Sequence, residues 1–80
     1  MSRKLLRRKP GSIDWLAVGR RVRELRGFDL TQADCARRIG VSQSYLSAVE
    51  HVRNQVRAKV LHAIGREFDR SLEWLLTGRE

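Results

Sequence analysis

A glutamine followed by small side chains stands directly after a glycine turn, at a spacing that gathers them on one side of a short helix. These residues are Gln43, Ser44, Ser47 and Ala48. Positions three and four apart on a helix are neighbours, so this face is polar and carries little bulk. A glutamine amide can donate and accept hydrogen bonds at once. The chemistry available to such a face is hydrogen bonding to the edges of nucleic-acid bases.

Two short amphipathic segments between residues 31 and 50 must position this face. Thr31 and Ser42 each stand where a hydroxyl can cap a helix start, with Asp34 as a short-armed capping-box acid after Thr31. Gly40 can adopt the left-handed conformation that ends the first segment. The apolar positions predicted to face inward are Cys35, Ala36, Ile39, Val41, Leu46 and Val49. The pattern predicts a helix, a tight turn and a second helix.

Length and charge limit what surrounds this motif. Eighty residues are enough for one domain with a small core. Seventeen Lys and Arg against nine Asp and Glu give a net charge of +8, which favours a polyanionic partner. Residues 1–11 hold five basic side chains and no acid, and are predicted to form a flexible basic arm whose Arg7 and Arg8 contact phosphates. Residues 12–80 are expected to form the folded domain.

Three further helices are predicted around the motif. Ser12 is expected to cap the first, which runs to Arg26 with Arg20, Arg21 and Arg23 on a solvated face. Its inward stripe is Trp15, Val18, Val22 and Leu25. A fourth helix over about 55–68, with Asn54 as its cap, has the inward positions Ala58, Leu61, Ile64, Gly65 and Phe68. Ser71 opens a short last helix, 72–76. The fold class is therefore all-α, a compact five-helix domain with a helix-turn-helix at helices 2 and 3.

The last helix carries more apolar side chains than a small core can accept. Leu72, Leu75 and Leu76 cannot all point inward, and Trp74 lies among them. Leftover apolar surface at one end of a small domain is typical of a contact with another chain. Trp74, Leu72 and Leu76 are therefore the expected homodimer interface.

Residues 12–78 resemble the DNA-binding domain of the phage repressor and Cro family, the Xre-like helix-turn-helix group. The matching residues are Leu25-Arg26, Leu30-Thr31-Gln32, Cys35-Ala36, Ile39-Gly40-Val41-Ser42, Leu46-Ser47, Val49-Glu50 and Ser71-Leu72-Glu73-Trp74-Leu75-Leu76-Thr77-Gly78. The resemblance implies that the second helix of the motif enters the major groove and that the first lies across the backbone. Gln43 then falls at the main base-contacting position, where an amide can bond adenine, and Gln32 at a phosphate contact. The resemblance also implies a structural ion pair between Arg26 and Glu50.

Two departures from the family pattern affect the site. After Glu50 the family commonly has Asn-Gly, whereas this chain has His51-Val52, and a β-branched valine is a poor occupant of a left-handed turn. Arg53 and Arg57 are therefore expected to supply phosphate contacts there. Tyr45 is expected to contact phosphate through its hydroxyl, to pack against the first helix, or both. Cys35 replaces a larger aliphatic residue and is expected to be a packing residue.

The spacing of the histidine, cysteine and serine residues, and the lack of a long apolar run, do not predict a catalytic site, a metal site or a membrane segment. His51, His62 and Cys35 lack the close repeated spacing of a zinc site, and no serine, histidine and acid are grouped by spacing. No metal, cofactor or catalytic residue is predicted. One cysteine cannot form an internal disulfide, and the N-terminal pair Leu5-Leu6 is too short for a signal or membrane segment, so a cytoplasmic protein is expected.

These features together predict a sequence-specific binder of double-stranded DNA, a transcriptional repressor that acts as a homodimer on a two-fold operator. Half-site centres would lie about 34 Å apart, one turn of DNA. The alternatives are an antitoxin with a toxin partner, or a protein-interaction module built on the same fold. An interaction module would carry apolar residues on the outer face of the second motif helix, whereas Gln43, Ser44 and Ser47 are polar.

Overall fold

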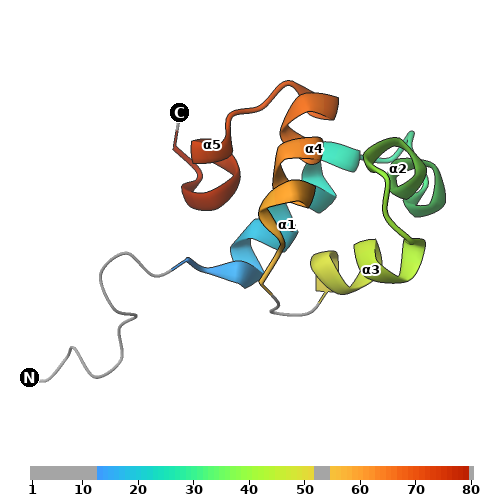
Figure 1. Ribbon diagram of the computed structural model, residues 1–80, viewed down its shortest axis with the longest axis horizontal. Coiled ribbons are helices and arrows are strands. Elements are labelled where there is room, and N and C mark those ends of the chain that lie inside the picture. Colours follow the sequence, from blue (N-terminus) through green and yellow to red (C-terminus); the bar gives the residue numbers. More distant parts are fainter. Residues whose placement is uncertain (1–12, 52–54, 80) are drawn as a thin grey trace, which may run out of the picture.

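The computed structural model describes residues 13–51 and 55–79, and in these ranges it contains five helices and no strand (Figure 1). The helices are α1 (Trp15–Arg26), α2 (Gln32–Ile39), α3 (Gln43–His51), α4 (Ala58–Phe68) and α5 (Leu72–Thr77). The all-α prediction, with the helix-turn-helix formed by α2 and α3, is confirmed.

Short polar side chains start most of these helices, as the sequence predicts. The Thr31 hydroxyl accepts a hydrogen bond from the Asp34 amide at 3.0 Å, and Ser42 accepts from Tyr45 at 3.0 Å. Ser71 does the same for α5. The first helix differs from expectation, because Asp14 is its cap and accepts from the Ala17 amide at 3.2 Å. Ser12, the expected cap, lies outside the described residues.

The turn between α2 and α3 closes on Gly40. This residue has φ +79° and ψ +31°, the left-handed conformation that an L side chain adopts only at a cost. Its amide donates to Arg37, and the next amide, of Val41, donates to Ala36 at 2.9 Å. This pair of bonds satisfies the last carbonyls of α2 and turns the chain sharply into α3.

The fourth helix is shorter than predicted. It begins at Ala58 with Arg57 as its N-cap residue, so Asn54, which lies outside the described residues, is not the cap. Arg57 has an extended backbone and its side chain makes no capping hydrogen bond. The start of α4 therefore carries none of the side-chain signals that mark the starts of α2, α3 and α5.

The inward face of α4 also differs in part from the prediction. Leu61 and Ile64 are buried as expected, but Ala58 is exposed. Val60, which was not expected in the core, is buried, and so is Val56 in the segment before the helix. The chain thus contributes Val56 to the core before the helix begins, and Arg57, between Val56 and the helix, has an extended backbone.

The core forms where α1 crosses the motif and the last two helices close over it. α1 contacts α3 and α5, α2 contacts α3 and α4, and α4 contacts α5 (Figure 1). The predicted inward residues Val18, Val22, Cys35, Ala36, Ile39, Leu46 and Val49 are all buried. Gly19 is the point of closest approach, because a Cβ there would lie 2.0 Å from the carbonyl oxygen of Val49 in α3. The missing side chain lets α1 lie directly on the second motif helix.

An arginine expected to be solvated holds the last helix in place. Arg21 of α1 donates from Nη1 to the carbonyl oxygen of Leu75 at 3.0 Å, at the C-terminal end of α5. A cation there is favourable to the exposed carbonyls of a helix end. In the part of the chain that the structure describes, no helix is long and apolar enough to cross a membrane.

Candidate nucleic-acid interface

The outer face of α3 presents the polar residues singled out from the sequence. Gln43 and Ser44 are exposed, and Ser47 and Ala48 are half-buried. The opposite side of the same helix is fixed in the core through Leu46 and Val49, which are 1% and 3% exposed. The apolar face of α3 is therefore anchored in the core while its polar face remains accessible to solvent. This arrangement suits entry of the helix into the major groove of DNA.

A chain of hydrogen bonds connects this outer face to a buried ion pair. Arg26 at the end of α1 donates to both carboxylate oxygens of Glu50, from Nε and from Nη2, each at 2.8 Å. The Gln32 amide at the start of α2 donates to Glu50 Oε1 at 3.0 Å. The Gln43 amide in turn donates to Gln32 Oε1 at 3.4 Å. Three helices thus contribute to one polar network that ends at the exposed face of α3.

The ion pair in this network is well satisfied despite its burial. The Glu50 side chain has no exposed surface and that of Arg26 is 16% exposed. Burial alone would raise the pKa of Glu50, but the hydrogen bonds from Arg26 and Gln32 hold it below its ordinary value. The hydrogen bond to Glu50 likewise raises the pKa of Arg26. A spare guanidinium nitrogen, Nη1, donates to the Leu30 carbonyl at 3.2 Å, so Arg26 also ties down the α1–α2 turn.

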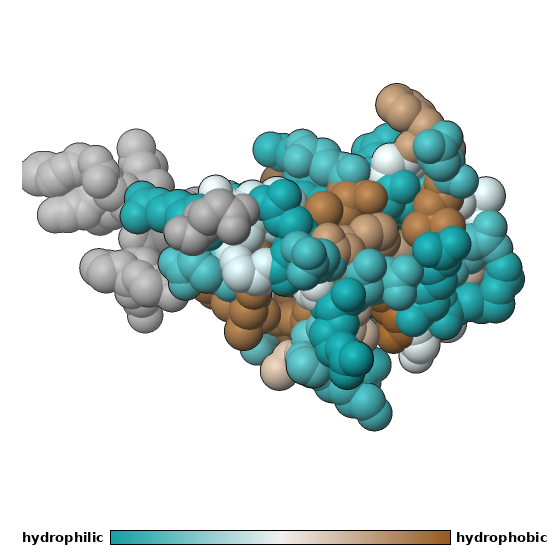
Figure 2. All heavy atoms as spheres, turned by 90° about the horizontal axis from the view of Figure 1, so that it is seen from above, coloured by the Kyte–Doolittle hydropathy of each residue, from teal (hydrophilic) through white to brown (hydrophobic). Residues whose placement is uncertain are grey.

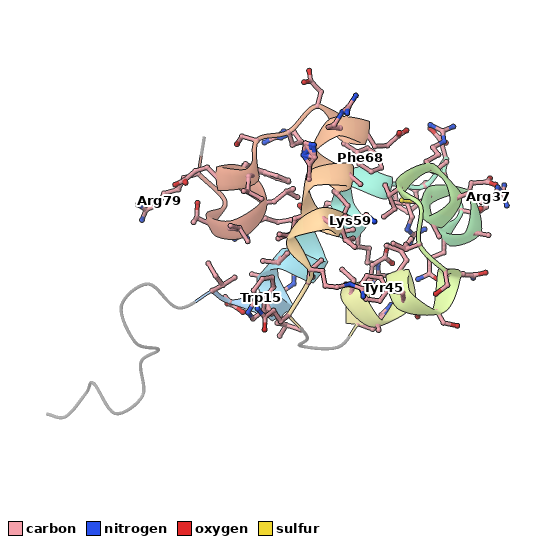
Figure 3. All side chains as sticks on the ribbon, viewed as in Figure 1. Trp15, Arg37, Tyr45, Lys59, Phe68 and Arg79 are labelled. Carbon is pink, nitrogen blue, oxygen red and sulfur yellow. The ribbon has the colours of Figure 1, made fainter. Side chains whose placement is uncertain are left out.

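Tyr45 of α3, labelled in Figure 3, meets Arg57 at the start of α4. The Arg57 guanidinium lies over the Tyr45 ring, 5.0 Å from its centroid, and the tyrosine hydroxyl accepts from the Arg57 amide at 3.4 Å. The aromatic ring therefore positions a cation beside the motif helix. The half-buried ring packs against the core, while its hydroxyl is already used within the chain.

A basic side of α4 continues from Arg57, and sequence reasoning did not single it out as part of a site. Lys59, His62 and Arg66 are exposed and lie on one side of the helix, at spacings of three and four. Shallow grooves beside them are lined by Arg38, Ala63 and Val60, and Figure 3 shows Lys59 on α4 close to the motif. The nearby acid Glu67 pairs with Arg38 at 3.2 Å. The 3-and-4 spacing of these basic residues in the sequence was the signal from which this side of α4 could have been predicted.

Some expected phosphate contacts lie outside the described residues. Arg7, Arg8 and Arg53 belong to this group. Val52, the valine expected to redirect the connection after α3, also lies outside the described residues. The described end of that helix has His51, whose Nδ1 is 3.0 Å from the Ser47 carbonyl oxygen.

Cys35 is a buried thiol with no exposed surface, as expected for a packing residue. Burial raises the pKa of the thiol, which keeps it protonated and poorly nucleophilic. Among the described residues, no three His, Cys, Asp or Glu side chains are grouped so that they could hold a metal ion.

The structure separates the three residues expected at a dimer interface. Leu72 is 52% exposed, and Leu76 is half-buried one turn further along α5 on the same side. Trp74 lies on the other side of this short helix, half-buried, with the Arg70 guanidinium 3.9 Å from its ring centroid. Leu75, which shares the helix, is fully buried.

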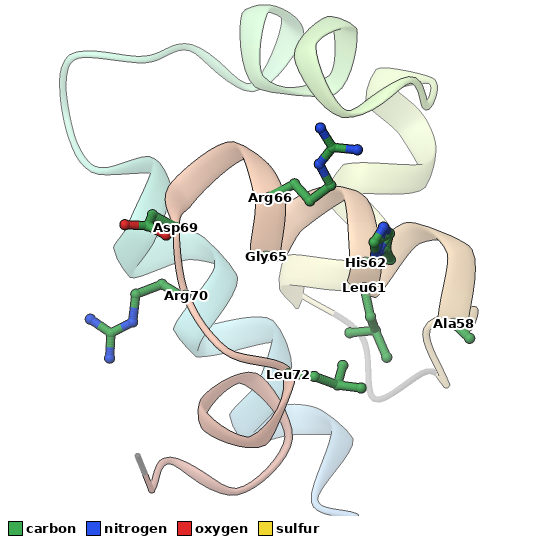
Figure 4. A pocket seen from close by; sticks show the side chains of 8 residues that line it. All are labelled: Ala58, Leu61, His62, Gly65, Arg66, Asp69, Arg70 and Leu72. Carbon is green, nitrogen blue, oxygen red and sulfur yellow. The ribbon is translucent and has the colours of Figure 1, made fainter.

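The exposed Leu72 borders a hollow between α4 and α5. This hollow, of about 300 Å³, is also lined by Leu61 and Gly65. Figure 4 shows Leu61 and Leu72 directed toward the same space, and Arg66 of α4 is also among the residues that line the hollow. The face seen from above in Figure 2 is mainly hydrophilic, with several separate groups of apolar atoms among the polar side chains. The apolar atoms visible on this face do not form one broad continuous patch.

A family model described as helix-turn-helix matches residues 20–75. The match covers α2, α3 and α4 and most of α1 and α5, so the chain belongs to the Cro/C1-type, Xre-like helix-turn-helix family of DNA-binding regulators, which are not enzymes. No curated protein sequence matches the chain significantly.

Solved structures of regulators share the fold over most of the chain. The P22 c2 repressor in complex with a synthetic operator is 27% identical, with a TM-score of 0.71, and the match covers 78% of this chain and 96% of the repressor chain. The restriction-modification controller protein C.AhdI from Aeromonas hydrophila is 28% identical over 79% of this chain and 97% of its own, with a TM-score of 0.70.

A third regulator structure also contains DNA. SinR, described as the master regulator for biofilm formation, was crystallised in complex with DNA and is 25% identical, with a TM-score of 0.66, over 72% of this chain and 95% of its own. This protein is therefore a helix-turn-helix domain similar to repressors and other transcription regulators.

Proposed function

We propose that this protein is a transcriptional repressor that binds double-stranded DNA sequence-specifically as a homodimer on a two-fold operator. The observation that carries the proposal is the outer face of α3, where the exposed Gln43 amide and Ser44 stand beside Ser47 and Ala48 on a helix fixed in the core. A polar face without bulky side chains can approach base edges, and its amide matches the donor and acceptor that adenine presents in the major groove.

Phosphate contacts on both sides of α3 would supply most of the affinity. Gln32 at the start of α2 combines a polar side chain with a helix N-terminus, which favours anions. On the other side of α3, Arg57 lies over the ring of Tyr45, a residue of this helix. The arm of residues 1–11, with Arg7 and Arg8, and the connection with Arg53 would add further cations. Such contacts strengthen binding without selecting a sequence.

The homodimer would form around α5 and the hollow beside it. Leu72 offers a large exposed apolar side chain next to Leu61, and Leu76 lies on the same side of α5. Trp74, on the other side of α5, would contribute only if the partner also reaches around the end of the helix. A two-fold dimer places two copies of α3 about 34 Å apart, in successive major grooves.

Selection of bound duplexes from a random pool tests the proposal directly. The full chain should enrich a sequence of two inverted half-sites with centres about 10 base pairs apart. Gln43→Ala should lose preference at one position in each half-site, while general affinity remains, because the phosphate contacts are intact. Enrichment of no sequence would refute the proposed function.

Two further measurements test the parts outside α3. Removal of residues 1–9 takes away five basic side chains and should flatten the dependence of log affinity on log salt, by up to about 0.9 for each phosphate that is no longer neutralised. An unchanged slope would exclude the arm from the interface.

Sedimentation equilibrium should show a dimer that Leu72→Glu converts to monomer. If the unaltered chain is a monomer even at high concentration, the proposed dimer is wrong.

A further inference from the structure

Hydrogen bonds connect the buried carboxylate of Glu50 through Gln32 to Gln43 on α3. The carboxylate at the buried end decides which group donates and which accepts at each step. Glu50 is ionised, because Arg26 and Gln32 keep its pKa low, and a carboxylate can only accept hydrogen bonds. The Gln32 amide must therefore turn its NH2 group toward Glu50, at 3.0 Å. Its carbonyl oxygen is then directed away from Glu50 and toward Gln43.

The same logic fixes the orientation of the Gln43 amide. Gln32 Oε1 is an acceptor, so Gln43 must present its NH2 group to it, at 3.4 Å. The amide of Gln43 has two N–H donors and one carbonyl oxygen. One N–H is used by Gln32, which leaves one N–H and the carbonyl oxygen in known positions. These are the two groups that bond adenine N7 and N6.

We propose that Glu50 is a positioning residue for base recognition: through Gln32 it fixes which way the Gln43 amide faces, and so favours adenine at the position that Gln43 contacts. This inference rests on the proposed DNA binding. Without the carboxylate, the amide of Gln43 could rotate by half a turn and exchange its donor and acceptor. A rotated amide would no longer match adenine better than other bases, although α3 would stay in place.

Two variants test the proposal on the operator selected by the full chain. Glu50→Gln keeps the size of the side chain but gives it both donors and an acceptor, so it no longer dictates the direction of the network. Gln32→Met interrupts the network and leaves the Arg26 and Glu50 pair intact, which keeps the test decisive if Glu50→Gln fails to fold. The matched control is Glu67→Gln, because this carboxylate pairs with Arg38 away from α3.

The measured quantity is the ratio of dissociation constants for adenine and for each other base at the Gln43 position. A bidentate amide contact discriminates by roughly 10- to 100-fold, and both variants should reduce that ratio by about 10-fold or more at this position only. Glu67→Gln should leave it unchanged. In a Gln43→Ala background, Glu50→Gln should cause no further loss, because the effect passes through Gln43.

An unchanged ratio in Gln32→Met overturns the proposal, and so does an equal loss of discrimination at all positions, which would indicate general loosening of the fold. These results differ from failure of the proposed function, since in that case the unaltered chain selects no operator. A specific operator with variants that keep their base preference would remove the role of Glu50 alone.

Discussion

Glu50 and the basic side chains along α4 are both charged, but their surroundings are opposite. Glu50 has no exposed side-chain surface and three hydrogen bonds from Arg26 and Gln32. Lys59 and Arg66 are exposed, and within the described part of the chain they make no ion pair. A side chain that orients its hydrogen-bond partners must itself be fixed by its neighbours. A cation that neutralises a DNA phosphate can remain exposed to solvent without such contacts.

These two regions would divide specificity and affinity between them. Residues 31–50 have no net charge, because Arg37 and Arg38 balance Asp34 and Glu50. The whole +8 charge therefore lies outside them. The buried network would determine which sequence is bound, and the exposed cations would determine how tightly and with what salt dependence.

The largest expected loss of stability comes from breaking the buried ion pair between Arg26 and Glu50. Glu50→Ala leaves the Arg26 charge without its carboxylate and should reduce the free energy of unfolding by about 3–5 kcal/mol. Urea denaturation measures it. Glu67→Ala, which breaks an exposed pair with Arg38, should cost about 0–1 kcal/mol. Similar losses in both variants would contradict the distinction between the two regions.

A smaller effect is expected where α1 rests on α3. Gly19→Ala places a methyl group against the Val49 carbonyl, which is backbone and cannot rotate away, so we expect a loss of about 1–3 kcal/mol. Gly40→Ala is the matched substitution, because nothing lies within 4 Å and only its φ of +79° opposes a side chain, at about 1 kcal/mol. Thermal unfolding of both variants compares them. Equal losses would show that α1 and α3 can move apart freely.

Acid should weaken the buried network gradually. The folded-state pKa of Glu50 lies below its ordinary value, so the unfolded chain binds more protons between the two values. The contribution of Glu50 is present above the ordinary value of about 4.3 and is lost as pH falls through the lower folded-state value. Unfolding measured from neutral pH downward should show this decline, and Glu50→Gln should remove that part of it. An identical decline in both proteins would place the acid sensitivity elsewhere.

The smallest effect on stability is expected on the basic side of α4. Lys59→Gln should change the free energy of unfolding by less than about 0.5 kcal/mol. It should nevertheless lower the salt slope of DNA binding by about 0.9 if Lys59 contacts a phosphate. Arg23→Gln removes the same charge from an exposed site on α1 and serves as the control. Equal slopes in the two variants would exclude Lys59 from the interface.

Local signals predicted much of the fold. Hydroxyl caps at Thr31, Ser42 and Ser71, and glycine at position 40, are decided by bonds between neighbours in the chain, and all four positions act as predicted. The first and fourth helices started later than predicted, at Trp15 and Ala58. Asp14 caps the first helix in place of the predicted Ser12, and Arg57, at the start of the fourth helix in place of the predicted Asn54, makes no side-chain capping bond.

Long-range contacts were harder to foresee. Arg21 resembled its solvated neighbours in the sequence, yet its carbonyl partner Leu75 is 54 residues away. The bonds of Gln32 to Glu50 and of Tyr45 to Arg57 likewise join separate parts of the fold. Such pairs depend on where helices cross, which periodicity does not specify.

The helix-turn-helix and its polar face follow from the amino-acid sequence alone, because capping, turn conformation and the burial of Leu46 and Val49 depend on residue types at fixed spacing. The connection from Gln43 through Gln32 to a buried carboxylate arises instead from tertiary packing. Hydrogen bonds act over about 3 Å, so their partners are set by the way α1, α2 and α3 pack together and not by distance along the chain.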